Sequence, residues 1–261
     1  MKLPIFQIDA FAEKPFEGNP AAVVPLQQWL PEAVMQQIAE ENNQAETAFY
    51  IPKGDDFHIR WFTPTKEVKL CGHATLATAH VLFNEYGYER DEVIFDSLSG
   101  ALSVSRNNGL LTLDFPSQPP VICETPELLR RGLGIEPVEC YQSMDFLVVV
   151  ENGQLLKAIE PDYNLLKQVD LRGVIVVAPG ELDDLWVRFF APKAGIPEDS
   201  VTGSAYTQIM PYWYVQTGNS KLNARQVSSR SGKVYCELVG DRVKISGSAV
   251  KYLAGTIDVL S

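Results

Sequence analysis

The sequence predicts an α+β protein built from two similar domains, and an internal repeat is the main observation behind this prediction. The first copy covers residues 55–64 (DDFHIRWFTP) and the second covers residues 183–192 (DDLWVRFFAP). Both copies place two acids, an alternating apolar run, an arginine, two aromatic residues and a proline at the same offsets. A repeat with a period of about half the chain indicates a duplicated domain.

A glycine-led segment follows each copy of the repeat. These segments are residues 71–74 (CGHA) and residues 202–205 (TGSA). Further along, residues 99–100 and 231–232 are both Ser-Gly, and each pair precedes two alternating runs joined by a turn. We therefore expect each domain to contain a strand, a helix that starts at a glycine, and further strands.

A proline-rich segment suggests where the two domains join. Residues 115–120 carry three prolines, which stop any regular element and make this the best candidate linker. We predict a first domain over residues 1–117, joined by a C-terminal strand over about 249–261. The second domain then covers residues 118–248.

Apolar patterning predicts the remaining strands and helices. A helix should begin near Pro31, because proline suits a first turn, and end near residues 42–43. Residues 74–86 are apolar on almost every side, which indicates a buried helix wrapped by strands. A similar buried helix should run from Gly203 to about residue 216, with Pro211 inside it and kinking it. Strands are predicted at residues 3–9, 21–24, 47–51, 55–64, 145–150, 173–178 and 185–190.

Composition narrows the class of protein. Of the 261 residues 46% are hydrophobic, and the formal net charge of −11 would repel nucleic acid and anionic membranes. We find no membrane span and no signal peptide. The four cysteines have no CxxC spacing, so neither a zinc site nor a disulfide framework is predicted, and we expect a cytoplasmic protein.

Glu46 is the first candidate catalytic residue. It lies between the predicted helix and strand, beside Ala45 and the apolar residues Ala48 and Phe49. A partly buried carboxyl there can hold or release a proton near neutral pH. The alternative is a glutamate at the end of a helix that faces water, as most acids do.

Gly72 and Gly203 are candidate anion-binding positions. Each would lie at the N-terminus of a buried helix, where unpaired N–H groups and the helix dipole attract a carboxylate. We expect the two termini, Ser204 included, to converge on one cleft between the domains. The alternative is that both glycines only permit tight turns.

Three further side chains accompany these glycines. His73 can transfer protons or hydrogen-bond a substrate, and Asp199 can orient His73 or bind a substrate amine; the alternative for Asp199 is a helix cap. Cys71 can have a lowered pKa ahead of a helix, but an inert buried thiol is the simpler interpretation because the second copy has Thr202 there. No metal site is predicted, since no potential ligands show a recognised spacing.

These residues fall into motifs that resemble the phenazine biosynthesis-like (PhzF-like) family. The resemblance spans nearly the whole chain, in order. It implies the diaminopimelate epimerase-like fold, in which two similar domains each curl a mixed sheet around a central helix, with the active site between them. The motifs are residues 9–11 (DAF), 18–23 (GNPAAV), 46–49 (ETAF), 71–75 (CGHAT) and 199–205 (DSVTGSA).

The resemblance also implies roles for the residues above. Glu46 becomes the catalytic acid/base, while Gly72 and His73, with Asp199, Gly203 and Ser204, line the substrate pocket. The family's phenazine enzyme is a cofactor-free, dimeric isomerase acting on a dihydro-hydroxyanthranilate, which implies no cofactor and a homodimer here. Two residues depart from the family pattern: Ser200 stands where proline is usual, and Tyr206 stands where a smaller or imidazole side chain is common. Both adjoin the implied pocket, so they concern the identity of the substrate more than the chemistry.

The working hypothesis is a cofactor-independent isomerase of a small carboxylate metabolite. Related racemases and epimerases use two cysteines, one per domain, whereas Cys71 is matched here by Thr202, whose hydroxyl is too weak an acid/base. Two rivals are a hydrolase that uses Cys71 with His73, and a non-catalytic protein that binds small molecules with the same fold.

Overall fold

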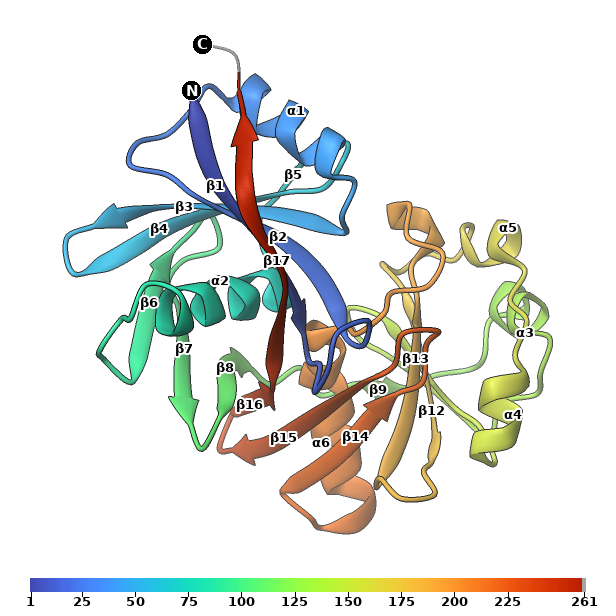
Figure 1. Ribbon diagram of the computed structural model, residues 1–261. Helices are drawn as coiled ribbons and strands as arrows, with labels where there is room; N and C mark the ends of the chain where they lie inside the picture. Colours follow the sequence, from blue (N-terminus) through green and yellow to red (C-terminus); the bar gives the residue numbers. More distant parts are fainter. Residues whose placement is uncertain (260–261) are drawn as a thin grey trace. The chain divides into compact units, whose positions relative to one another are not determined.

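The computed structural model describes residues 1–259 of the chain, and these form two compact units. Unit 1 contains Met1–Asp114 and the chain from Ser246 onward, and unit 2 contains Phe115–Ile245. The predicted C-terminal strand over 249–261 is β17 (Ala249–Asp258), and residues 260–261 lie outside the described part. Figure 1 shows the elements along the chain.

Unit 1 is a mixed sheet with two helices. The helices are α1 (Glu32–Asn42) and α2 (Gly72–Asn84). Its strands are β1 (Lys2–Ala10), β2 (Asn19–Pro25), β3 (Glu46–Lys53), β4 (Asp56–Phe62), β5 (Glu67–Val68), β6 (Glu92–Asp96), β7 (Leu102–Asn107), β8 (Leu110–Pro116) and β17.

Unit 2 likewise has parallel and antiparallel strand pairs, with more helical turns. Its helices are α3 (Glu127–Leu133), α4 (Gly153–Ala158), α5 (Tyr163–Leu166) and α6 (Tyr206–Thr217), with 3-10 turns at Pro192–Ala194 and Gly203–Ala205. Its strands are β9 (Val121–Ile122), β10 (Glu139–Gln142), β11 (Phe146–Val149), β12 (Val174–Pro179), β13 (Leu185–Phe190), β14 (Lys221–Gln226), β15 (Gly232–Val239) and β16 (Arg242–Gly247).

The strand directions show the duplication that the repeat predicted. In unit 1, the pairs β1–β2, β2–β3, β3–β4, β4–β6 and β6–β7 are antiparallel, parallel, antiparallel, parallel and antiparallel. In unit 2, the pairs β10–β11, β11–β12, β12–β13, β13–β14 and β14–β15 follow the same series. The repeated segments are β4 and β13, and a helix that begins at a glycine follows each one.

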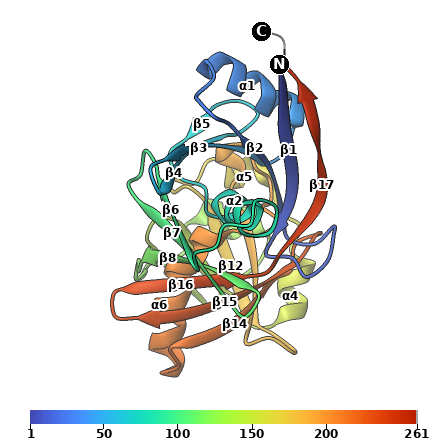
Figure 2. The ribbon, with the colours of Figure 1, turned by 60° about the vertical axis from the view of Figure 1, so that its left-hand side comes forward.

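Helix α2 is the core of unit 1. Its sequence is apolar on every face, and side chains around the whole circumference are buried. Figure 2 views α2 nearly along its axis, with the strands of unit 1 around it. The α+β class and a mixed sheet curled around a helix are therefore confirmed.

Helix α6 differs from its prediction. A 3-10 turn over Gly203–Ala205 precedes it, and only its first half is buried. Tyr214 and Val215 in the second half are 46% and 79% exposed. Apolar residues occur on all sides of this helix, so the pattern could not identify the half that leaves the core.

The predicted linker also begins later than expected. Strand β8 continues through Phe115 to Pro116, because Phe115 is buried and the proline occupies the last strand position. No helix within residues 1–259 is long and apolar enough to cross a membrane.

Candidate active site

A strained loop places Asn19 in unit 1. Gly18 has φ +66°, and a Cβ atom at this position would lie 2.1 Å from the carbonyl oxygen of Ala10, so only glycine fits. The Phe16 N–H donates to Asp9 Oδ2 at 3.0 Å, which ties the loop to the end of β1. Asn19, the next residue after Gly18, is consequently buried at the start of β2.

Glu46 is the first residue of β3, aligned with Ala21 in the parallel pair β2–β3. Just beside it, the Asn42 side-chain amide donates to Thr47 Oγ1 at 3.2 Å and ties the end of α1 to the strand. The Glu46 residue is 9% exposed. Its Oε2 lies 3.2 Å from Nε2 of His73. The alternative of a water-facing glutamate is therefore wrong.

His73 lies in the first turn of α2 and is also buried. On the other side of its ring, Nδ1 lies 3.4 Å from Asn19 Nδ2 and 3.6 Å from Cys71 Sγ. Because an amide nitrogen can only donate, we assign Nδ1 as the acceptor, which puts the ring proton on Nε2, toward Glu46. At 3.2 Å this contact is close but not aligned as a hydrogen bond.

Burial sets the charge of His73. It lowers the pKa of the imidazole from its ordinary value of 6.5 to about 4. A carboxylate at 3.2 Å favours the imidazolium, but loss of water from the buried ring is the larger effect. The ring is therefore neutral at physiological pH, and the contact with Glu46 joins a carboxyl group to a neutral N–H.

Glu46, Cys71 and His73 each bring one potential metal-ligand atom within 4.8 Å of the other two. The ring geometry does not suit a shared ion. Cys71 faces Nδ1 whereas Glu46 faces Nε2, so the imidazole lies between the other two groups. A metal bound at one ring nitrogen would lie away from the ligand on the opposite side.

The helix starts in the two units have the same local form. Cys71 and Thr202 each have an extended backbone and directly precede a glycine. Neither side chain caps the N–H groups that follow. The first N–H groups at Gly72 and Gly203 are thus available to an anion in each unit.

Asp199 holds the residue ahead of Gly203 in unit 2. The Thr202 hydroxyl donates to Asp199 Oδ2 at 2.5 Å, so Thr202 is fixed by Asp199. The Gln226 side chain anchors both residues, donating to the Asp199 carbonyl at 2.7 Å and accepting from the Thr202 N–H at 2.9 Å. Asp199 therefore shapes the helix start without being its capping residue.

Sequence reasoning missed a polar cluster beside Ser204. Asp145 is fully buried, and its carboxylate accepts from Arg172 Nε at 2.9 Å and from Gln208 Nε2 at 3.0 Å. Arg172 Nη2 donates to Ser204 Oγ at 3.0 Å. These residues are 27 to 63 positions apart in the sequence. The signal that the sequence offers is an acid, Asp145, directly before the apolar strand Phe146–Val149.

The two departures from the family motif have different surroundings. Tyr206 is fully buried at the start of α6, and burial raises the pKa of its phenol well above 10. It is part of the core of unit 2. The Ser200 carbonyl accepts from the Ser228 hydroxyl at 2.8 Å, and Ser200 itself is partly exposed.

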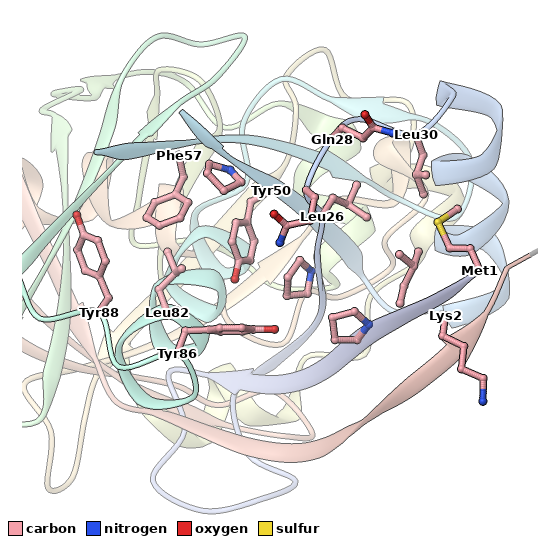
Figure 3. A pocket seen from close by; sticks show the side chains of 15 residues that line it. Met1, Lys2, Leu26, Gln28, Leu30, Tyr50, Phe57, Leu82, Tyr86 and Tyr88 are labelled. Atoms are coloured by element: carbon pink, nitrogen blue, oxygen red, sulfur yellow. The ribbon is translucent and has the colours of Figure 1, made fainter. Parts of the chain in front are cut away.

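A separate cavity of about 650 Å³ opens in unit 1, lined mainly by apolar and aromatic side chains (Figure 3). Tyr50, Tyr86 and Tyr88 line it together with Phe57 and Leu82. None of the predicted site residues lines this cavity. We therefore do not assign this cavity as the candidate active site. That assignment follows from the groups around Glu46.

Comparisons with known proteins identify an isomerase class. An uncharacterized isomerase of Pseudomonas aeruginosa is 47% identical over 98% of this chain and 99% of its own length. A PhzF-family crystal structure from Enterococcus faecalis has a TM-score of 0.97 and 44% identity, covering 99% of this chain and 100% of that one. A hydroxyproline epimerase from Agrobacterium vitis, with 10% identity and a TM-score of 0.63 over 98% of this chain and 92% of that one, shares the fold alone.

The family follows from a match to most of the chain. The family model described as phenazine biosynthesis-like protein matches residues 8–255. The chain belongs to this family, and the resemblance inferred from the sequence motifs is confirmed.

Proposed function

We propose that this protein is a cofactor-independent isomerase that moves a C–H proton on a small carboxylate by general acid/base catalysis. One observation carries the proposal: the buried carboxyl of Glu46 lies 3.2 Å from Nε2 of His73, whose pKa is lowered to about 4. A carboxylate beside a neutral N–H donor can accept a proton and return it.

In the proposed mechanism, a helix N-terminus binds the substrate carboxylate, and Gly72 and Gly203 begin the two candidate helices. Their fixed N–H dipoles stabilise the negative charge that develops as the C–H proton leaves. Glu46 takes this proton and delivers it to another carbon of the same substrate. The neutral ring of His73, with Nε2 3.2 Å from the carboxyl oxygen, limits the positions open to Glu46.

Unit 2 supplies the remaining proposed contacts. Ser204 binds the carboxylate, and Asp199 assists by holding Thr202 ahead of Gly203. Thr202 corresponds to Cys71, so the unit lacks the second thiol that a two-cysteine racemase uses. A threonine hydroxyl is too weak an acid to exchange a proton in that role.

The test combines ligand binding with isotope exchange. Small amino-, hydroxy- and aromatic carboxylates are screened for thermal stabilisation, and those that bind are incubated in D₂O with wild type, Glu46→Gln and Glu41→Gln. Glu41 is an exposed acid of α1 and makes the matched control. We expect all three proteins to bind, and deuterium to enter the ligand with wild type and Glu41→Gln only. Substantial exchange with Glu46→Gln refutes the assignment, and binding without exchange in any variant refutes the chemistry.

The 3.6 Å contact between Cys71 Sγ and His73 Nδ1 favours a second candidate, a cysteine-dependent hydrolase. The low pKa of His73 argues against it, because such a weak base does not hold the thiol proton. Cys71→Ser should therefore keep isomerase exchange, and iodoacetamide should inactivate slowly at a buried thiol. Complete loss with Cys71→Ser would favour the hydrolase.

We further propose a cytoplasmic homodimer. Strand β17 pairs with β1 from Ala249 to Asp258. Tyr252 and Leu253 on this strand are 49% and 43% exposed. Large apolar side chains exposed together on one strand are a common surface for contact with another copy.

A further inference from the structure

The cluster around Arg172 is held more firmly than a surface ion pair. Its guanidinium makes a two-pronged contact with Asp145, from Nε at 2.9 Å and from Nη2 at 2.5 Å, and Asp145 is fully buried. Gln208 completes the cluster, accepting from the Asp145 N–H at 3.3 Å and donating to its carboxylate. Two-pronged arginine–carboxylate pairs fix the orientation of the guanidinium as well as its position.

The backbone and an aromatic ring also constrain Arg172. The guanidinium carbon lies 5.5 Å from the centre of the Phe189 ring. At Gly173, a Cβ atom would lie 2.6 Å from the same ring, so glycine is needed for the chain to pass Phe189 here. Arg172 thus presents one fixed face, and its side chain is 39% exposed.

The fixed guanidinium of Arg172 determines how the Ser204 hydroxyl can hydrogen-bond. Arginine only donates hydrogen bonds, so the Ser204 oxygen accepts from Arg172 Nη2 and keeps its own proton for another partner. In the described residues no acceptor is bonded to the Ser204 hydroxyl, and the residue is partly exposed. A ligand that meets it finds an O–H donor beside a positive charge, next to the N–H groups at Gly203.

We propose that Arg172 is a positioning residue that fixes Ser204 as a hydrogen-bond donor, and so makes this helix start select a carboxylate over the matching carboxamide. A carboxylate carries a negative charge and two acceptor oxygens that face the hydroxyl proton and the Arg172 charge, whereas a carboxamide is neutral and its N–H₂ group accepts no hydrogen bond. The inference rests on the proposed function, in which Ser204 binds the substrate carboxylate.

The experiment compares carboxylates with their primary amides, and 2-aminobenzoate and 2-aminobenzamide are the first pair. Dissociation constants are measured for wild type, Arg172→Lys, Ser204→Ala and the double variant. Arg225→Lys, from another arginine–aspartate pair of unit 2 at 2.8 Å, is the matched control. Lysine keeps a charge near Asp145 but loses the planar fork that reaches Asp145 and Ser204 together.

We expect Arg172→Lys to weaken carboxylate binding by about tenfold, the effect of losing one charge-assisted hydrogen bond, and to change amide binding little. Ser204→Ala should have a similar effect, and the double variant should lose no more than either single variant, because Arg172 acts through Ser204. Arg225→Lys should bind as wild type does. If Arg172→Lys is poorly folded, the charge-free pair Asp145→Asn with Arg172→Gln replaces it and should show the same loss.

The outcomes separate this inference from the proposed function. If Ser204→Ala weakens carboxylate binding but Arg172→Lys does not, only the role of Arg172 is wrong. Additive losses in the double variant would also overturn it. If Ser204→Ala has no effect, or wild type does not prefer the carboxylates, the proposed binding site is wrong and the inference with it.

Discussion

Replacing His73 with asparagine tests whether a buried, neutral imidazole lies beside Glu46. The pKa of this histidine is lowered from 6.5 to about 4 by burial in the folded protein. As the pH falls, the unfolded chain therefore takes up the proton first. The stability that comes from keeping the ring neutral is present above pH 6.5 and is lost as the pH falls toward 4.

The size of the effect follows from the shift. One pKa unit corresponds to about 1.4 kcal/mol, so the shift from 6.5 to about 4 corresponds to about 3 kcal/mol of unfolding free energy. Between about pH 7.5 and about pH 5, the wild type should lose about 2 kcal/mol more unfolding free energy than His73→Asn does.

Urea unfolding at both pH values measures this difference. His58→Asn removes a histidine in β4, outside the site, and is the matched control. We expect it to keep the pH dependence of the wild type. A His73→Asn protein that loses as much stability on acidification as wild type would show that His73 is protonated, or exposed to water, in the folded state.

Two further predictions concern the loop and the surface of unit 1. Gly18→Ala should cost at least about 3 kcal/mol of unfolding free energy, because its Cβ would meet the Ala10 carbonyl at 2.1 Å. Gly109→Ala, at φ +81° with open space around it, should cost only about 1–2 kcal/mol, and equal losses in urea unfolding would contradict the steric argument. Leu253→Lys should convert a dimer to a monomer in analytical ultracentrifugation, whereas Leu182→Lys, at a 98% exposed site of unit 2, should not. A monomeric wild type would rule out the proposed dimer.

Much of the fold could be predicted because its signals are local. The two copies of the repeat became β4 and β13, since alternation and turn residues act within a few positions. The short helices α3, α4 and α5 were not predicted. They are only four to seven residues long, and tertiary packing stabilises helices of this length more than their own sequence does.

The site was harder to predict where it depends on contacts between distant residues. His73 follows directly from the glycine at a helix start, which the sequence displays. Asn19 touches His73 from 54 positions away, and Arg172 reaches Ser204 across 32. Such contacts depend on how strands align in the sheet, and the residues between them give no periodic signal.

The pairing of β17 with β1 has a consequence for the order in which the protein can form during synthesis. The partners Lys2 and Asp258 come from opposite ends of the described chain, whereas unit 2 is one continuous stretch between them. All residues of unit 2 are therefore synthesised before β17. The unit that holds Glu46 lacks one strand of its sheet until β17 has been synthesised. Truncation of the chain before Ala249 should consequently destabilise unit 1 and leave unit 2 folded.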